Sequence, residues 1–211
     1  MLEITPEVPY TVAASQKPSV FLAGSIEMGR ARLWQDEVVK ELSKLDVTVF
    51  NPRRKQWDWG LDPTTVTPAL DEQVRWEQEY MELADIVLFM FLGNTQSAIS
   101  LLEYGKCYGE DKSTIVIVEP EFYRRGNLVI MQNMIQEPTY SSLEEALPSL
   151  IGALTHTTAQ FMHCSMAGTY WIDCNVLKNN LDGTYLISYN DFIIKEVVTE
   201  VVDHHDLKFK L

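Results

Sequence analysis

The sequence predicts an α/β domain, in which helices cover both faces of a mainly parallel sheet, followed by a small all-β unit. Along residues 19–160, short apolar runs alternate with longer segments of helical periodicity, the pattern of consecutive βαβ units. The apolar runs contain few polar residues, as expected for parallel strands that are buried on both faces. After residue 160 the pattern changes to polar residues that alternate with β-branched and aromatic ones.

The α/β domain is expected over residues 19–160, after a loose lead-in at residues 1–18. The segment “SVFLAGS” (residues 19–25) has the character of a short buried strand that runs into a glycine turn. Residues 31–45 then place apolar side chains at helical spacing, so a helix follows the strand. The later elements continue this alternation: strand 47–52, loop 53–68, helix 69–85, strand 86–92, helix 97–110, strand 113–120 and helix 140–154.

The C-terminal segment, residues 165–211, has the alternation of β-strands. Within it, “LDGT” places Asp182 and Gly183 as the tip of a two-residue hairpin. We therefore expect a small all-β appendage of the SH3-like meander type. Units of this size bind proteins, nucleic acids or sister subunits, so the pattern leaves the role of the segment open.

Composition and charge narrow the possible partners. The chain has 211 residues, enough to bury a core without disulfides, and a formal net charge of −13 at pH 7. That charge repels nucleic-acid backbones and anionic lipid, so we expect a small-molecule substrate instead of nucleic acid or a membrane. Three cysteines are too few for a disulfide framework and favour a cytoplasmic location. The start of the sequence lacks the features of a signal peptide, and the most apolar run, “ADIVLFMFLG”, is too short to cross a bilayer.

In open parallel sheets, ligands bind at the carboxyl ends of the strands. In this chain those ends are “AGSIEMGR”, “NPRRKQWDW”, “GNTQSAIS” and “EPEFYRRGN”, all rich in polar residues or glycine. In the first of them, Gly24 and Gly29 bracket Ser25 between a strand and a helix, which suits a phosphate cradle as well as an ordinary tight turn. The segment has neither the P-loop lysine nor the G-x-G-x-x-G spacing. We therefore expect the binding site at this edge of the sheet.

Three carboxylates are expected near the strand at residues 86–92. Asp85 begins this strand, Glu77 lies two helical turns earlier, and Glu103 lies in the first turns of the next helix, where Gly105 and Gly109 leave room for a close backbone approach. Carboxylates that converge at strand ends suit glycosidic chemistry, because one can attack the anomeric carbon while another handles the proton of the leaving group. The structural alternative is two solvated helix acids and one aspartate at a strand edge.

Other chemistries have less support in the sequence. Cys164 and Cys174 have no CxxC partner, and the His204–His205 pair lacks the i, i+4 spacing of a helical metal site, so we expect no metal and no cofactor. No G-x-S-x-G elbow supports a Ser-His-Asp triad. Trp57 and Trp59 lie in a polar loop and are candidates for stacking on a planar ligand.

Five segments, in order, resemble the nucleoside 2-deoxyribosyltransferase superfamily, and in particular its nucleoside 2-deoxyribosyltransferase-like branch. They are “VFLAGSIEMGRARLW”, “NPRRKQWDW”, “QVRWEQEYMELADIVLFMF”, “TQSAISLLEYGK” and “YRRGNLV”. The resemblance does not reach the C-terminal β segment. It implies a flavodoxin-like or Rossmann-like sheet, a homo-oligomer, and cleavage of 2′-deoxyribonucleosides with transfer of the deoxyribosyl group to another base or to water.

The resemblance also implies roles for individual residues. Glu103, in “LLEYGK”, corresponds to the glutamate that attacks C1′ and holds the sugar as a covalent ester. Glu77 stands where the family usually has a second, aspartic acid; the extra methylene moves the carboxylate by about an ångström, and proton delivery to the base is sensitive to such shifts. Asn127, in “RRGNLV”, matches an asparagine that reaches across a subunit interface to the 5′-hydroxyl of the sugar.

The pattern at the 5′ end of the sugar is mixed. Ser97 stands where the transferases often have aspartate, whereas the related nucleoside 5′-monophosphate N-glycosidases have a serine that contacts phosphate. Glu27 would repel a phosphate at this end. We therefore expect deoxynucleosides to be preferred over their monophosphates. The turn “GSIEMGR” is expected to line the substrate through Gly24, Ser25, Ile26 and Arg30.

Recognition of the base needs a flat apolar slot with a few polar edges. We expect this slot to be formed by Arg53, Trp57, Asp58 and Met90. Two alternatives to the transferase remain open at this point. One is an N-glycosidase that hydrolyses nucleoside 5′-monophosphates, and the other is a module that binds a nucleoside or nucleotide without turnover.

Overall fold

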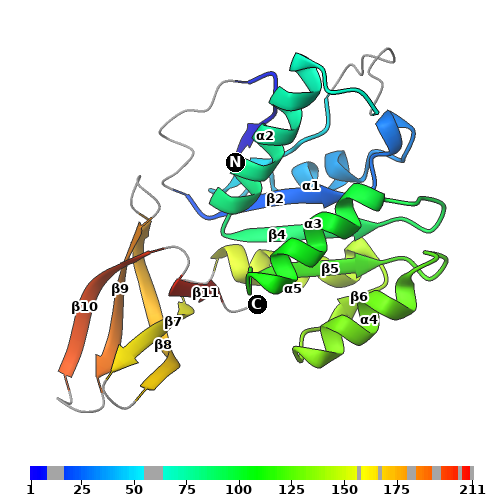
Figure 1. The fold of residues 1–211 in the computed structure, drawn as a ribbon. Helices are drawn as coiled ribbons and strands as arrows, with labels where there is room; N and C mark the ends of the chain where they lie inside the picture. The colour runs from blue at the N-terminus through cyan, green and yellow to red at the C-terminus, as the bar shows by residue number, and fades with distance from the viewer. Residues whose placement is uncertain are drawn as a thin grey trace.

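The computed structural model of the chain describes residues 1–8, 17–54, 64–155, 158–165, 168–179, 184–191, 196–203 and 206–209. These residues form two sheets. One is a six-stranded parallel sheet with helices on both faces, and the other is a five-stranded antiparallel sheet near the C-terminus (Figure 1). The structure therefore confirms the predicted α/β class and the all-β character of the C-terminal segment.

The parallel sheet has the strand order β1-β3-β2-β4-β5-β6. Apart from the added edge strand β1, this is the 2-1-3-4-5 order of a doubly wound sheet, which reverses direction between β2 and β4. A ligand crevice is expected at the carboxyl ends of those two strands. The strands are β1 (Leu2–Ile4), β2 (Ser19–Gly24), β3 (Thr48–Phe50), β4 (Ile86–Phe91), β5 (Thr114–Val118) and β6 (Thr139–Tyr140).

Three elements of this domain differ from the expectation. The lead-in contains β1, whose Ile4 is fully buried and which pairs in parallel with β3. The last strand, β6, has only two residues and lies where a helix was expected to begin. Helix α4 (Arg125–Met134) was not predicted, because its first turn contains Gly126 and Asn127, which have low helix propensity. Strands of two or three residues are too short to show a periodicity in the sequence.

The helices separate into two layers (Figure 1). Helices α1 and α5 pack on one face of the sheet, around a core that includes Trp34 and Leu88. Helices α2, α3 and α4 pack on the other face, around Phe89 and Tyr104. Burial on both sides explains why the strand sequences are apolar throughout. The helices not yet bounded are α1 (Trp34–Leu42), α2 (Pro68–Leu83), α3 (Ala98–Gly109) and α5 (Leu143–Thr155).

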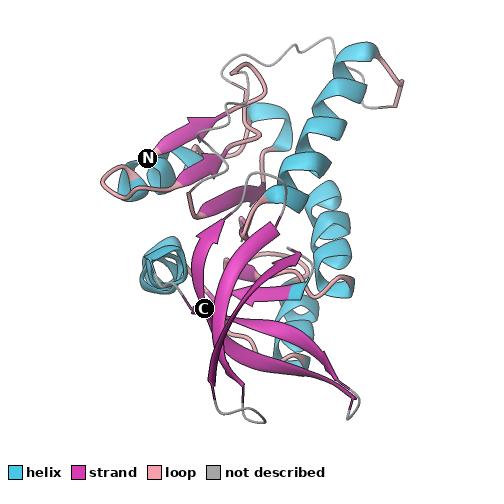
Figure 2. Cartoon of the chain, turned by 90° about the vertical axis from the view of Figure 1, so that its left-hand side faces the viewer, coloured by secondary structure: helices cyan, strands magenta, loops and turns pink. Residues whose placement is uncertain are grey.

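The second sheet has the order β10-β9-β8-β7-β11, and its neighbouring strands are antiparallel. Its strands curve around a small core of their own, which includes Phe161, Ile187 and Leu207 (Figure 2). The predicted SH3-like type is not confirmed. The first strand begins at Thr158, earlier than expected, and the predicted hairpin tip at residues 182–183 lies outside the described residues. The strands are β7 (Thr158–Ser165), β8 (Gly168–Asn179), β9 (Thr184–Asp191), β10 (Glu196–Asp203) and β11 (Leu207–Phe209).

Two glycines of the α/β domain have opposite surroundings. Gly24, the last residue of β2, has a φ of 140°, and a Cβ at this position would lie 2.2 Å from the carbonyl oxygen of Met90 on β4. No side chain fits that space. Gly105 in α3 is exposed, and a Cβ there would meet nothing within 4 Å, as is also true of Gly109. The close backbone approach expected at Gly105 and Gly109 is therefore wrong, and the close approach is at Gly24.

This contrast predicts opposite effects of the same substitution. Gly24→Ala should lower the free energy of unfolding by about 1–3 kcal/mol or more, because it combines a strained φ with a clash against backbone. Gly105→Ala should raise it by about 0.5–1 kcal/mol, because alanine loses less conformational entropy in a helix. Urea unfolding with equal m-values in all three proteins would measure both changes. A Gly24→Ala variant as stable as the wild type would show that β2 and β4 do not meet as described.

Candidate active site

Three hydroxyl groups meet where β2 and β4 end. Ser25 Oγ lies 2.7 Å from Thr95 Oγ1 and 2.6 Å from Ser97 Oγ, and the last two oxygens are 2.9 Å apart. Ser25 follows β2 directly, whereas Thr95 and Ser97 lie between β4 and α3. The triangle therefore joins two segments far apart in sequence, at the point where the strand order predicts a ligand crevice.

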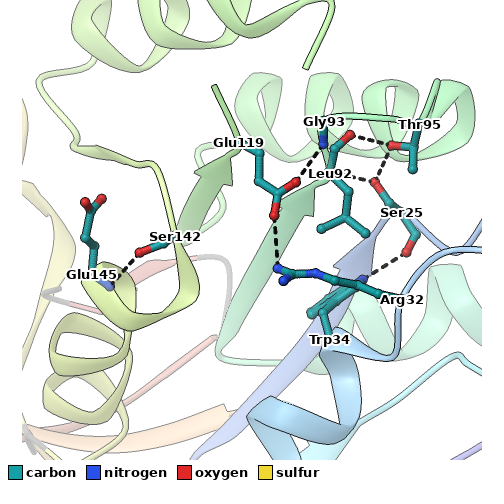
Figure 3. Close-up of polar contacts among 9 residues, drawn as sticks. All are labelled: Ser25, Arg32, Trp34, Leu92, Gly93, Thr95, Glu119, Ser142 and Glu145. Atoms are coloured by element: carbon teal, nitrogen blue, oxygen red, sulfur yellow. Dashed lines mark hydrogen bonds and ion pairs between the residues drawn. The ribbon is translucent and has the colours of Figure 1, made fainter. Parts of the chain in front are cut away.

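The backbone around the hydroxyl triangle is also held by hydrogen bonds (Figure 3). Leu92 N donates to Ser25 Oγ at 3.0 Å, and Thr95 Oγ1 contacts Leu92 O at 2.9 Å. The indole Nε1 of Trp34 donates to Ser25 O at 2.9 Å, and Ser100 Oγ in α3 donates to Gly24 O at 2.9 Å. These bonds hold the start of α3 against the end of β2.

Two carboxylates accept bonds from backbone N–H groups at this edge. Glu27 Oε1 accepts from the N–H groups of Gln96 and Ser97, each at 2.9 Å. Glu119 Oε2 accepts from Gly93 N at 2.8 Å, and its Oε1 lies 3.1 Å from Arg32 Nη2 (Figure 3). Glu27 and Ser97 both have positive φ, 50° and 47°, so this contact joins two strained residues. Strain at a strand edge of this kind is common at functional sites.

Glu103 lies buried in α3 on the face of the sheet that it shares with α2, and its side chain interacts with Glu77 of α2. Burial, and secondarily the charge of Glu77, raise the pKa of Glu103 to about 8, while Lys106 opposes this shift. Burial also raises the pKa of Glu77, against the effects of a hydrogen bond from Gln73 and the charge of Arg54. Both acids therefore have pKa values above the ordinary value of a glutamate.

A chain of polar side chains supports Glu77 from the end of β3. Gln73 Nε2 donates to Glu77 Oε1 at 2.8 Å and to the carbonyl of Pro52 at 3.1 Å. Arg54 Nε donates to Gln73 Oε1 at 2.6 Å. The bonds fix the orientation of Glu77, whose charge raises the pKa of Glu103.

Two interacting carboxyls with raised pKa values can divide the roles of base and acid. When one is ionised, its charge favours the protonated form of the other, so the pair holds one proton over a range of pH. The ionised member can act as nucleophile or base, and the protonated member can deliver a proton to a leaving group.

The structure does not bring Asp85 into this pair, so its expected catalytic role is corrected. Asp85 is buried before β4, at the amino end of the strands, and its Oδ2 accepts from both the N–H and the Oγ of Ser19, each at 2.7 Å. Asp85 N donates in return to Ser19 Oγ at 3.0 Å. These bonds join the starts of β2 and β4, at the edge opposite the hydroxyl triangle. The sequence shows that Asp85 lies next to a strand, but it does not show at which end of the sheet the residue lies.

Arg53 and Met90 also differ from the expected base slot. The guanidinium of Arg53 is buried and donates to the carbonyls of Gly29, Ala31 and Arg32 at 2.7–3.1 Å, so it positions the segment after β2. Burial lowers its pKa from the ordinary value. Met90 packs in the core under α1 and α5, on the face of the sheet away from Glu103. Trp57 and Asp58 lie outside the described residues.

The remaining predicted residues lie around the edge or apart from it. Ser25 and Ser97 belong to the hydroxyl triangle, and Ile26 and Arg30 belong to the short turn beside it, where Ile26 O accepts from Gly29 N and Ala31 N. Asn127 is exposed in α4. It does not contact Glu103 or Glu77 in any described interaction.

Sequence reasoning missed Thr95, Gln73, and the structural roles of Glu27 and Glu119. Gln73 could have been found, because it lies four residues before Glu77 on one helix and therefore faces the same side. The contacts of Glu27 and Glu119 span 69 or 70 and 26 residues, so no local pattern announces them.

Among the described residues, no group of three or more His, Cys, Asp or Glu side chains is arranged to hold a metal ion. In the same part of the chain, no helix has both the length and the apolar character needed to cross a membrane.

The raised pKa of Glu103 predicts how stability changes with pH. The folded state holds a proton that the unfolded chain releases near pH 4.5, so stability should fall as pH rises from about 4.5 to about 8. Glu103→Gln removes this penalty and should be stabilised relative to the wild type at pH 8–9, by on the order of 2–4 kcal/mol more than at pH 5. Urea unfolding at several pH values measures the difference. The substitution of the exposed Glu110 by Gln is the matched control, because its effect on stability should not change over this pH range. A Glu103→Gln effect that also stays constant over this pH range would contradict the prediction.

A comparison with known families identifies the family to which this chain belongs. The model of the family described as nucleoside 2-deoxyribosyltransferase like matches residues 17–122, which include the hydroxyl triangle and both glutamates of the pair. No individual curated protein matches the chain. The match spans half of the 211 residues, from before β2 to beyond β5, and so contains the whole switch point of the sheet. The chain therefore belongs to the nucleoside 2-deoxyribosyltransferase-like family.

Proposed function

We propose that this protein cleaves the N-glycosidic bond of 2′-deoxyribonucleosides and transfers the deoxyribosyl group to another base or to water. Family membership supports the substrate class. The observation that carries the reaction is the interaction of buried Glu103 with Glu77, on the face of the sheet beside the polar carboxyl edge. Burying the carboxyl group of Glu103 costs free energy, and a structural role on a solvated helix face would not require that burial.

In the first half-reaction, Glu77 takes the proton that Glu103 holds, and the ionised Glu103 attacks C1′ of the sugar. The bond between C1′ and the base nitrogen breaks, its electron pair goes to the base, and Glu77 supplies the proton that neutralises the base. The product is an ester between Glu103 and C1′. In the second half-reaction, a nitrogen of another base or a water attacks C1′, the ester bond breaks, and Glu77 takes the proton of the nucleophile.

The residues suit this chemistry for electrostatic reasons. Positive charge develops on the sugar as the base departs, and a carboxylate about 3 Å from C1′ stabilises it before it forms the bond. A 2′-deoxy sugar reaches this state more easily than a ribose, because it lacks an electron-withdrawing hydroxyl at C2′. The positive charge that develops at C1′ as the base departs also favours the ionised form of Glu103.

Two alternatives use the same residues. Hydrolysis of nucleoside 5′-monophosphates would need donors for phosphate at the edge formed by Ser25 and Ser97. A binding module without turnover would be consistent with Glu103 remaining protonated near neutral pH. Products from a panel of deoxynucleosides and their 5′-monophosphates, incubated with and without a second base and separated by chromatography, discriminate among the three.

The assignment of Glu103 predicts both a loss and a trapped species. Glu103→Ala should reduce base release by at least ~10²–10⁴-fold, because the variant cannot form the ester. After a denaturing quench, mass spectrometry of the wild type should find a deoxyribosyl adduct on the peptide that contains Glu103.

Glu77→Gln provides the contrast. It should slow release of ordinary bases but have a much smaller effect on 7-methyl-2′-deoxyguanosine, whose base leaves without needing a proton. Glu110→Ala, which changes an exposed residue directly after α3, controls for surface charge. Normal turnover by Glu103→Ala would exclude Glu103 as the nucleophile.

We also propose that Asn127 completes the site of a second copy of the chain. It is exposed on α4, and large apolar side chains are exposed on the same layer of helices: Ile99 and Leu102 on α3, and Ile130 and Met134 on α4. Their relative exposures are 64%, 71%, 62% and 71%, which is high for residues that would remain in water. A second copy packed on this layer would cover them and bring Asn127 to a neighbouring Glu103.

Mixing two inactive variants tests this arrangement. If Asn127 acts across an interface, co-refolded Glu103→Ala and Asn127→Ala chains should regain activity at about a quarter of the sites, since in a two-fold dimer only mixed pairs contain one intact site. Activity is measured before and after mixing, with each variant refolded alone as the control. An active monomer by light scattering would exclude the role of Asn127 in a neighbouring site.

A further inference from the structure

The side-chain amide of Gln73 can take only one orientation. Arg54 Nε lies 2.6 Å from Gln73 Oε1, and the carbonyl oxygen of Pro52 lies 3.1 Å from Gln73 Nε2. A guanidinium can only donate a hydrogen bond, and a carbonyl oxygen can only accept one. If the amide were turned over, two donors would meet at Arg54 and two acceptors would meet at Pro52. The oxygen of Gln73 therefore faces Arg54, and its NH₂ group takes the other side.

This orientation makes Gln73 a donor toward Glu77. The NH₂ group has two protons, one for the carbonyl of Pro52 and one for Glu77 Oε1, which lies 2.8 Å from Gln73 Nε2. A donor beside a carboxyl group stabilises its ionised form, whereas an acceptor would stabilise its protonated form. The bond from Gln73 therefore favours ionised Glu77.

Burial and charge strengthen this effect. Gln73 is only 7% exposed, so water does not compete freely for its amide. It precedes Glu77 by four residues on α2, which places both side chains on one face of the helix. Burial raises the pKa of Glu77, and both the bond from Gln73 and the positive charge of Arg54 oppose this increase. Arg54 thus acts on Glu77 in two ways, through its charge and through the amide that it orients.

Glu103 has no comparable support. Its side chain is buried on α3, and among the described residues none donates a hydrogen bond to its carboxyl group. Lys106, on the same helix, donates to Gln78 Oε1 at 3.3 Å and acts on Glu103 only through its charge. Burial and the charge of Glu77 raise the pKa of Glu103 to about 8 in spite of Lys106.

The charged groups that face the pair come from three segments. Glu77 lies on α2, Glu103 and Lys106 lie on α3, and Arg54 lies in the segment after β3. Cys107 of α3 adds no charge, because burial raises the pKa of its thiol to about 12. The pair is therefore asymmetric, since only Glu77 receives a hydrogen bond from an amide that a cation holds in place.

We propose that Gln73 and Arg54 are positioning residues that place the proton of the carboxyl pair on Glu103 and keep Glu77 ionised before the reaction. Gln73 acts through Glu77, and Arg54 acts through Gln73. When the reaction begins, the O–H bond of Glu103 breaks and an O–H bond forms at Glu77, so one negative charge moves from Glu77 to Glu103. The use of this proton rests on the proposed function, but its location in the free protein does not.

Carbon-13 NMR locates the proton directly. The protein is labelled at the side-chain carboxyl carbons of glutamate, whose chemical shifts change on ionisation. The substitutions Glu77→Gln and Glu103→Gln assign the two signals, which are then followed against pH. This measurement needs neither substrate nor activity.

The variants separate the amide and the cation from net charge. Gln73→Met removes the donor to Glu77 but keeps a side chain of similar length, and Arg54→Met removes the cation that orients the amide. Arg54→Lys tests for rescue, because an ammonium can still donate to Gln73 Oε1. Arg75→Met is the matched control, since it removes a positive charge from an exposed position on α2.

In the wild type, Glu77 should ionise at a lower pH than Glu103, by at least about one pH unit. Arg54→Met and Gln73→Met should narrow this interval by roughly one pH unit, whereas Arg54→Lys should retain most of it. Arg75→Met should leave the interval unchanged. Base release from a deoxynucleoside gives a second readout. The acid limb of the kcat/KM profile should move to higher pH by roughly one unit in Arg54→Met and Gln73→Met, because the active form contains ionised Glu77.

A Glu77 signal that ionises after that of Glu103 would overturn the proposal. An interval that neither Arg54→Met nor Gln73→Met narrows would do the same. If the wild type releases no base from any deoxynucleoside, the proposed function fails, and the NMR titration still decides where the proton lies. If one variant does not fold, the other variant and the wild-type order of ionisation decide the result.

Discussion

The site depends on how closely β2 and β4 approach at their carboxyl ends. Only a residue without a Cβ fits at Gly24, where the backbone passes against the carbonyl of Met90. Because the strands stay paired to this point, Ser25 emerges directly beside the segment that follows β4 and accepts the N–H of Leu92. The hydroxyl triangle then fixes where α3 begins. The start of α3 in turn sets the position of Glu103, which lies in the second turn of the helix.

Burial of an acidic side chain in the layer formed by α2 and α3 costs electrostatic free energy. Glu103 is buried in it and interacts with Glu77, and burial shifts both pKa values upward. An apolar residue of similar volume in place of Glu103 would avoid the desolvation cost at that position, since Glu103 forms no ion pair in the described part of the chain. Retaining two such groups is expected where function, and not stability, determines the residue.

At the carboxyl edge, one residue sets both the shape of a loop and the charge beside it. Glu27 bonds to Gln96 and Ser97 and so holds the loop before α3 in a conformation with positive φ. The same carboxylate supplies a negative charge in a place where many nucleotide-binding folds leave backbone N–H groups available for phosphate. Glu119 acts similarly toward Gly93 and Arg32. The protein thus satisfies its own donors at this edge with carboxylates.

The sequence alone determined the class of the fold, because alternating apolar and amphipathic segments can bury their faces in few other ways. It also indicated Glu103, since the resemblance depends on local motifs that the folded chain retains. It did not determine which end or face of the sheet a residue would reach. Asp85 and Met90 belong to or adjoin the same strand as the site, yet Asp85 ties the opposite ends of two strands and Met90 faces the other layer. Arg53 follows β3 as expected, but bonds to backbone carbonyls of another segment. Such placements depend on strand register and on contacts between distant segments, and only the tertiary structure decides them.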